Sequence, residues 1–106
     1  DGERALSYSS DSTLRLWNLK DGSSKVFKGH TKSISRVQLL DGERALSYSR
    51  DSTIRLWCLS TQKLLNIYVF EGIDKVVDIG NNRLLCFASN GQHRFLEIMD
   101  NEIKQT

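Results

Sequence analysis

The stretch Asp41-Gly-Glu-Arg-Ala-Leu-Ser-Tyr-Ser-Arg-Asp-Ser-Thr-Ile-Arg-Leu-Trp57 decides the fold, because the chain contains it twice. Residues 1–17 carry the same sequence, apart from Ser10 in place of Arg50 and Leu14 in place of Ile54. The two copies stand 40 residues apart. Chance does not give such a match, so the chain is built from a duplicated unit of that length.

A third copy is visible at the same offset of 40 residues, where Asn81–Gly91 lies over Asp41–Asp51. Turn-forming residues and an apolar run are retained, but Glu97 stands at the tryptophan position. The third unit is therefore degenerate. Because the end units of a repeat array are atypical, we expect it to be the terminal unit.

Short strand-like segments alternate with turns inside one unit. They cover residues 34–40, 44–49, 53–59 and 64–70, and no stretch shows sustained helical periodicity. Ile54 and Leu56 alternate with Trp57 and Leu59, so both faces of the sheet are apolar, as in a sheet packed between two others. The sequence predicts an all-β fold made of four-stranded antiparallel sheets.

Composition excludes several classes of protein. The net charge of +2 over 106 residues is too small to predict a nucleic-acid or anionic-membrane partner. No apolar run approaches the roughly 18 residues of a spanning helix. Cys58 and Cys86 lie in apolar strand-like segments without a second ligand at metal-binding spacing, so we expect no metal. Unpaired cysteines favour an intracellular, cytoplasmic location.

Several residues of the second unit resemble the WD-repeat β-propeller family. They are Gly29-His30, Ser47, Asp51 and the strand that ends at Trp57. The duplicated sequence is similar to the near-identical tandem repeats of large, often bacterial, multidomain proteins. The resemblance is strong over residues 1–70 and weak over residues 71–106. The aspartate of the name-giving Trp-Asp pair is replaced, by Asn18 in the first copy and by Cys58 in the second.

The resemblance implies part of a β-propeller with blades of about 40 residues. Residues 1–28 would hold the end of a first blade plus the next outer strand, residues 29–70 a complete repeat, and residues 71–106 the degenerate, terminal repeat. A closed propeller needs about four to eight blades. We expect the remaining blades of a longer parent chain to close the ring; other copies of this chain are the alternative.

The resemblance also implies a hydrogen-bonded tetrad of His30, Ser47, Asp51 and Trp57. A buried indole N–H needs an acceptor, and a serine hydroxyl can accept from it while donating to an imidazole. The first unit supplies a partial copy, and the third supplies none of the four, with Ile73 at the histidine position. The members of the partial copy are Ser7, Asp11 and Trp17.

Serine, histidine and aspartate also suggest a hydrolase triad. A structural role is favoured, because the repeat copies its serine and aspartate whereas a catalytic triad occurs once, and no Gly-x-Ser-x-Gly elbow is present. The Asp-Gly pairs at 1–2, 21–22 and 41–42 lack the Asp-x-Asp-x-Asp spacing of a calcium loop and predict hairpin turns. We therefore expect no catalytic residue, metal or cofactor.

The family implies a non-catalytic scaffold that binds a protein or peptide. The polar difference inside the duplicated stretch is Ser10 against Arg50, next to the aspartate of the turn. We predict Lys32, Ser33 and Arg50 as contact residues; simple solvation of these side chains is the alternative. A second hypothesis is a sensor or autoinhibitory module of a larger signalling protein with an NTPase, protease or kinase domain upstream.

Overall fold

The computed structural model describes residues 4–106, so the Asp1–Gly2 turn lies outside the described part. Its strands form three sheets. The first sheet contains β1 (Arg4–Tyr8), β2 (Thr13–Asn18) and β3 (Ser24–Lys28). The second contains β4 (Ile34–Leu39), β5 (Arg44–Ser49), β6 (Thr53–Cys58) and β7 (Leu64–Val69). The third contains β8 (Ile73–Gly80), β9 (Arg83–Ala88), β10 (His93–Met99) and β11 (Glu102–Gln105).

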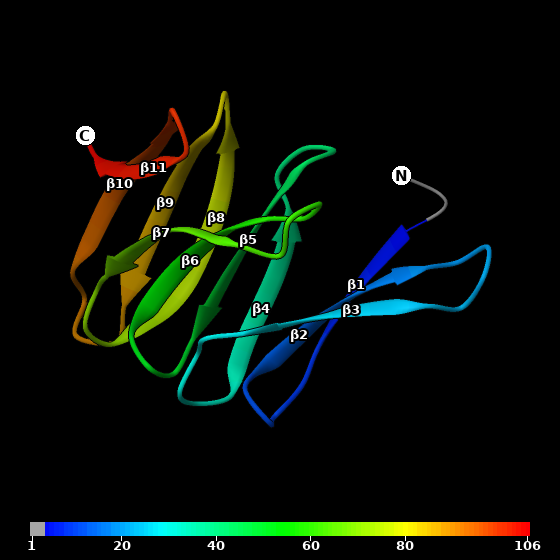
Figure 1. Ribbon diagram of the computed structural model, residues 1–106. Helices are drawn as coiled ribbons and strands as arrows, with labels where there is room; N and C mark the ends of the chain where they lie inside the picture. The colour runs from blue at the N-terminus through cyan, green and yellow to red at the C-terminus, as the bar shows by residue number, and fades with distance from the viewer. Residues whose placement is uncertain (1–3) are drawn as a thin grey trace.

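Each sheet is an antiparallel meander in which strands adjacent in sequence pair with one another. The three sheets stand face to face in sequence order, from the blue first sheet to the red and yellow third sheet in Figure 1. Such a stack of meanders is part of a β-propeller, so the predicted fold class is confirmed. The four strands predicted for the second sheet also lie where the structure has them, to within one residue at their ends.

Short turns with aspartate side chains join the strands. In the turn between β2 and β3, Asp21 Oδ1 accepts from the backbone N–H of Ser23 at 2.8 Å. In the turn between β4 and β5, Asp41 Oδ1 accepts from the N–H groups of Glu43 at 2.9 Å and Arg44 at 2.8 Å. Two of the predicted Asp-Gly hairpin turns are therefore formed, and their carboxylates stabilise the turns themselves.

Two apolar layers hold the three sheets together. Between the first and second sheets, the buried residues are Leu14, Leu16, Phe27, Ile34, Ala45, Trp57 and Leu59. Phe27 and Trp57 meet edge to face, with ring centroids 5.7 Å apart. Between the second and third sheets, Leu46, Ile54 and Leu56 join Leu84, Cys86, Leu96 and Ile98. The second sheet is thus apolar on both faces, as its sequence pattern predicted.

The third unit is shifted by one residue from the alignment that the sequence suggested. In the second sheet Ser47 pairs with Val37 and Arg55, and Ala45 pairs with Trp57. In the third sheet the same places are held by Cys86 between Val76 and Arg94, and by Leu84 opposite Leu96. The correct offset is therefore 39 residues, and Leu96, not Glu97, takes the place of the tryptophan.

Two local changes in chain length cause this shift. The pairing of β6 with β7 is irregular between Leu56 and Trp57, so Val69 pairs with Thr53 one residue later than the repeat would place it. The loop that follows, residues 70–72, is two residues shorter than the corresponding loop, residues 29–33. The extra residue in the β6–β7 hairpin and the two residues missing from the loop together shorten the spacing between the second and third units by one residue, from 40 to 39.

Candidate functional site

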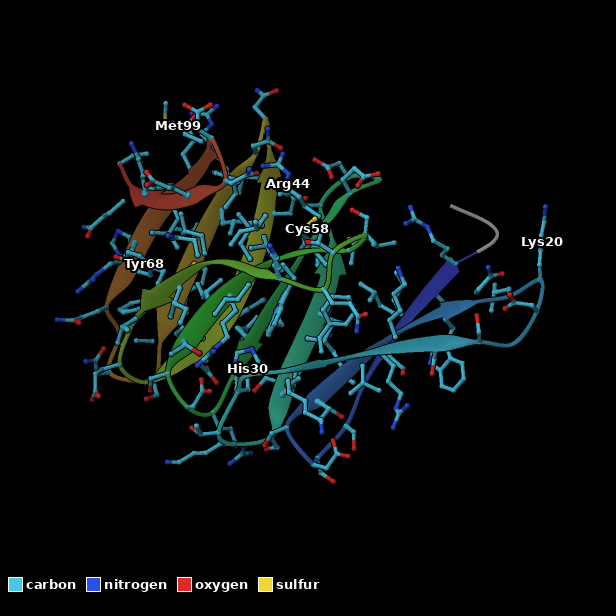
Figure 2. The ribbon with its side chains drawn as sticks, viewed as in Figure 1. Lys20, His30, Arg44, Cys58, Tyr68 and Met99 are labelled. Atoms are coloured by element: carbon cyan, nitrogen blue, oxygen red, sulfur yellow. The ribbon has the colours of Figure 1, made fainter. Side chains whose placement is uncertain are left out.

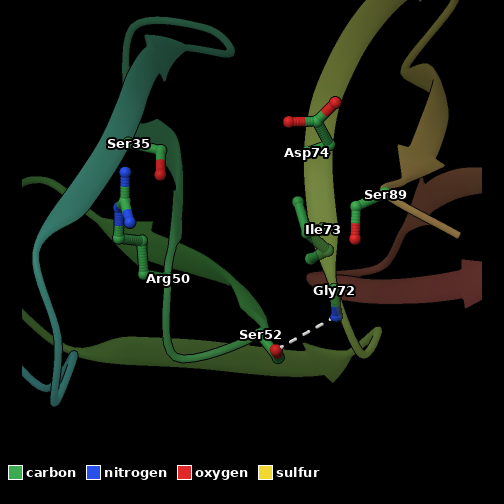
Figure 3. A pocket seen from close by; sticks show the side chains of 7 residues that line it. All are labelled: Ser35, Arg50, Ser52, Gly72, Ile73, Asp74 and Ser89. Atoms are coloured by element: carbon green, nitrogen blue, oxygen red, sulfur yellow. Dashed lines mark hydrogen bonds between the residues drawn. The ribbon is translucent and has the colours of Figure 1, made fainter.

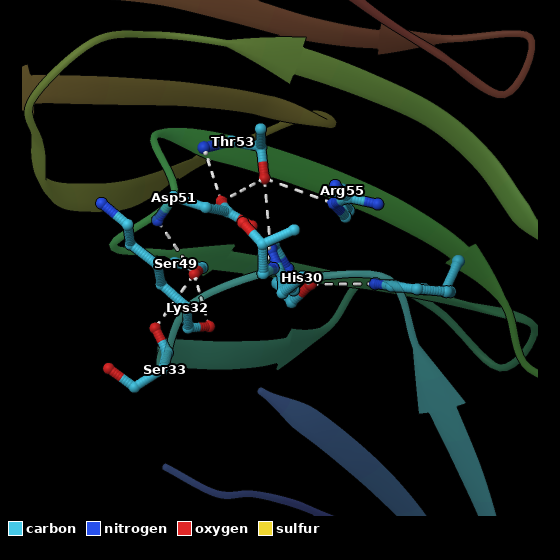
Figure 4. Close-up of polar contacts among 10 residues, drawn as sticks. His30, Lys32, Ser33, Ser49, Asp51, Thr53 and Arg55 are labelled. Carbon is cyan, nitrogen blue, oxygen red and sulfur yellow. Dashed lines mark hydrogen bonds and ion pairs between the residues drawn. The ribbon is translucent and has the colours of Figure 1, made fainter. Parts of the chain in front are cut away.

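Four side chains form a connected network where the chain enters the second sheet. Trp57 Nε1 donates to Ser47 Oγ at 2.8 Å, and Ser47 Oγ lies 2.6 Å from His30 Nε2. The other ring nitrogen, His30 Nδ1, lies 2.9 Å from Asp51 Oδ2. The loop between β3 and β4 supplies the histidine, and the turn between β5 and β6 supplies the aspartate (Figure 4). The structure thus brings the four predicted residues together.

The hydrogen-bonding capacity of each group fixes the histidine tautomer. An indole N–H can only donate, so Ser47 Oγ accepts from Trp57 and uses its single proton to donate to His30 Nε2. His30 Nδ1 therefore carries the ring proton and donates to the Asp51 carboxylate. This assignment gives each group in the network a partner.

The charge states follow from the surroundings of the two ionisable groups. Burial lowers the pKa of His30 below its ordinary value, and the hydrogen bond to Asp51 offsets this effect only in part. Burial alone would raise the pKa of Asp51. Hydrogen bonds from Thr53, from the Thr31 N–H and from His30 outweigh it and lower the pKa to about 2. A neutral imidazole next to an ionised carboxylate is the result at neutral pH.

The sequence reasoning missed two further members of the network. Thr53 Oγ1 donates to Asp51 Oδ1 at 2.5 Å, and Ser49 Oγ bonds the backbone oxygens of Lys32 and Ser33 at 3.0 and 2.9 Å. Both residues are identical in the first copy, as Thr13 and Ser9. Their identity in the two copies is a signal that the sequence carries, although the tetrad that the family resemblance implies does not include them.

Ser47 is closed to a substrate. It is 1% exposed, lies under the loop that carries His30, and already accepts a hydrogen bond from Trp57. A serine nucleophile needs an open path to a carbonyl carbon. The geometry therefore suits a structural network that joins loop, turn and two strands.

The other two sheets carry reduced forms of the network. In the first sheet Trp17 Nε1 donates to Ser7 Oγ at 2.9 Å, while Asp11 Oδ1 accepts from the Thr13 N–H at 3.0 Å. In the third sheet the places of serine, aspartate and tryptophan are held by Cys86, Asn90 and Leu96. Burial raises the pKa of the Cys86 thiol to about 11, so this position is apolar and inert.

The predicted contact residues lie at the end of the sheets where the chain passes from β3 to β4, from β5 to β6 and from β7 to β8; we call it the loop end. Lys32 and Arg50 are exposed there, and Ser33 is half-buried. The Arg50 N–H donates to the Ser33 oxygen at 3.2 Å. At the other end of the second sheet lie the turns near Arg44 and Cys58 (Figure 2).

Comparisons with known proteins agree with this architecture. Residues 22–58 match the family "WD domain, G-beta repeat". A comparison with curated protein sequences gives no significant match. Among solved structures, the C-terminal WD40 domain of Sif2 is 25% identical with a TM-score of 0.82, and the match covers 96% of this chain and 31% of that one.

Two further solved structures show the same fold at lower identity. The β-propeller domain of Myceliophteria thermophila Cps50 (Swd1) is 18% identical with a TM-score of 0.83, and the match covers 99% of this chain and 34% of that one. The WD40 β-propeller domain of Doa1 is 20% identical with a TM-score of 0.83, covering 94% and 35%. The chain thus spans about a third of each of these three structures.

No helix among residues 4–106 is long and apolar enough to cross a membrane. The duplicated unit, the stacked meanders and the matches to WD40 repeats and domains lead to one conclusion. Residues 22–58 match the WD-repeat family, and the described chain has the fold of part of a WD40 β-propeller domain.

Proposed function

We propose that the chain is a non-catalytic protein–protein interaction scaffold that binds a protein or peptide at its loop end, through Lys32, Ser33 and Arg50. WD40 propellers generally act as scaffolds for protein interactions. The proposal rests on one observation: the first two units are nearly identical in sequence, yet they differ in an exposed polar side chain, which is Ser10 in the first and Arg50 in the second. Variation on a constant frame is the arrangement that a binding surface requires.

The Arg50 guanidinium makes no polar contact with the described part of the chain. The backbone N–H of the same residue is bonded to Ser33. Ser10 occupies the same place in the first unit. Because the first unit folds with a serine there, the fold does not depend on an arginine at this position. The arginine is therefore available to a partner, and arginine is enriched among residues that dominate protein interfaces.

The His30–Asp51 network supports the proposal by holding the loop end in place. Asp51 Oδ2 accepts from the backbone N–H of Thr31 at 3.0 Å, and Ser49 bonds the carbonyl oxygens of Lys32 and Ser33. The loop before β4 is thereby tied to the turn before β6. A binding surface that is already ordered loses less conformational entropy when it binds.

The proposal extends to the parent assembly. The outer faces of the first and third sheets need further blades to close a ring, and we propose that these belong to a longer parent chain, with further copies of this chain as the alternative. The terminal position of the third unit remains a prediction. Unpaired Cys58 and Cys86 favour a reducing, cytoplasmic location.

Photo-crosslinking at defined positions tests the proposal. Benzoylphenylalanine placed at Lys32 or Ser33 is expected to give discrete adducts with a partner in an extract of the source cells. Glu43 and Lys63, exposed at the opposite end of the second sheet, are the control positions. The same adduct pattern from both ends, or none from the loop end, would refute a binding surface around Lys32 and Ser33.

A further inference from the structure

A pocket lies at the loop end, between the second and third sheets. Its volume is about 340 Å³, within the lower range of ligand pockets. Ser35 and Arg50 line it from the second sheet, and Asp74 and Ser89 line it from the third (Figure 3). The volume accommodates a few side chains of a partner rather than a folded element.

Opposite charges face each other across this pocket. Arg50 and Asp74 stand on opposite walls, both are exposed, and they form no ion pair with each other. Neither side chain has a hydrogen-bonding partner among residues 4–106. One wall therefore offers guanidinium donors and the other wall offers carboxylate acceptors, with serine hydroxyls between them that can serve in either role.

The fold does not require this pair of charges. At the junction between the first and second sheets, Ser10 takes the place of Arg50 in the repeat. Ser35, which follows Ile34 at the start of β4, takes the place of Asp74, which follows Ile73 at the start of β8. Both equivalents are neutral, so the charges distinguish one junction from the other.

Two hydrogen bonds hold the backbone of Gly72, which lines the pocket. The Gly72 N–H donates to Ser52 Oγ at 3.2 Å, and the Ser89 N–H donates to the Gly72 oxygen at 3.0 Å. Gly72 has a φ of +76°, and a Cβ added to it would lie 3.3 Å from Ser89 Oγ. A glycine here permits the left-handed backbone and keeps the pocket open.

We propose that this pocket binds a peptide segment that carries an acidic and a basic side chain close together. The acidic side chain contacts Arg50, and the basic side chain contacts Asp74. This assignment rests on the proposed scaffold function and specifies the chemistry of the partner. A purely acidic or purely basic segment would meet attraction on one wall and repulsion on the other.

Titration of the 15N-labelled chain with short blocked peptides tests the assignment. The probes are Gly-Glu-Ser-Lys-Gly and its charge-reversed order Gly-Lys-Ser-Glu-Gly, compared with Gly-Glu-Ser-Glu-Gly and Gly-Lys-Ser-Lys-Gly. At least one mixed-charge peptide is expected to give saturable shifts of the amide signals of Arg50, Gly72 and Ser89. The di-glutamate and di-lysine peptides, whose two charges have the same sign, should each bind at least about fivefold more weakly.

Charge-reversal variants sharpen the test, because both residues are exposed and their replacement leaves the packing intact. Arg50→Glu makes both walls acidic and should turn the preference to the di-lysine peptide, whereas Asp74→Lys should turn it to the di-glutamate peptide. Lys63→Glu and Glu43→Lys change the net charge by the same amounts at the other end of the second sheet. These two controls should leave the preference unchanged.

Each outcome has a definite meaning. Absence of saturable shifts with all the peptides, equal affinity for them, or the same switch of preference in the control variants overturns the assignment. Crosslinks from Lys32 or Ser33 would then still support the scaffold function with another kind of partner. Peptide binding that switches as expected, without such crosslinks, would support the pocket at Arg50 and place Lys32 and Ser33 outside the contact surface.

Discussion

The Ser47 hydroxyl serves two neighbours at once, since it accepts from Trp57 and donates to His30. The corresponding Ser7 in the first sheet accepts from Trp17, and the structure describes no histidine beside it. The two copies are otherwise nearly identical in sequence. They therefore form an internal comparison from which the contribution of the histidine and aspartate can be measured.

We predict that Asp51→Asn destabilises the chain much more than Asp11→Asn. Asp51 accepts from His30, from the Thr31 N–H and from Thr53, and an amide NH₂ facing these donors would leave one of them unpaired. An unsatisfied buried donor costs about 1–3 kcal/mol of unfolding free energy. Asp11 is exposed, and both hydrogen bonds that it accepts from Thr13 end on Oδ1, which asparagine retains.

Urea unfolding followed by tryptophan fluorescence measures both variants against the parent chain. A lower midpoint for Asp51→Asn together with an unchanged midpoint for Asp11→Asn is the expected result. Equal midpoints for the two variants would show that the histidine branch of the network contributes nothing to stability.

The pH dependence of stability provides a second prediction at this scale. The pKa of folded His30 lies below the ordinary value of 6.5, so an unfolded chain takes up a proton that the folded chain refuses. Stability therefore falls as the pH drops below about 6.5. Asp51, with its pKa lowered from 3.8 to about 2, adds a second loss below about pH 4.

Urea midpoints between about pH 7 and about pH 5 isolate the histidine contribution. His30→Gln should flatten the profile in this window, whereas His93→Gln, which replaces an exposed histidine, should retain the slope of the parent chain. A parent profile that stays flat, or a slope that survives in His30→Gln, would contradict a buried neutral imidazole.

At the scale of strands and sheets, the sequence predicted the strands of the second sheet correctly, but it aligned the third unit on the second with an error of one residue. Alternating apolar residues and Asp-Gly turns located the strands of the second sheet, because local pattern determines them. The third unit was aligned at 40 residues, which placed Glu97 over Trp57. The true offset depends on an irregular pairing near Leu56 and on a short loop, and neither leaves a local signature. A shift of one residue exchanges the two faces of a strand.

The corrected register predicts the effect of restoring the serine of the repeat. Cys86 is fully buried in the place of Ser47, but Leu96 stands where the tryptophan would be. Cys86→Ser would therefore bury a hydroxyl without the indole donor that Ser47 has. We expect it to lower the unfolding free energy by about 1–3 kcal/mol.

Cys58→Ser is the matched control, because Cys58 is only half-buried and lies beside the Ser60 hydroxyl. It should leave the urea midpoint close to that of the parent chain. A Cys86→Ser variant as stable as Cys58→Ser would mean that the position is not the apolar counterpart of Ser47.

At the scale of the whole molecule, the same face is covered in one sheet and open in another. Leu56 in the second sheet is fully buried by the third sheet, whereas Phe95, at the corresponding position of the third sheet, is 47% exposed. Phe87 is exposed on the same face. The sequence predicted open faces because it holds fewer units than a closed propeller needs. The corrected register is needed to identify the residues on these open faces, such as Phe87 and Phe95.

If these sheets are blades that need covering neighbours, the mass of the chain in solution shows it most directly. Analytical ultracentrifugation over a range of concentrations should show self-association, because another copy is the available cover for Phe87 and Phe95 in a purified sample. Phe95→Glu should reduce the association, and Leu19→Glu, an exposed change in the turn between β2 and β3, should not. A monomer of 12.1 kDa at all concentrations, with a sharp cooperative melt, would contradict the account.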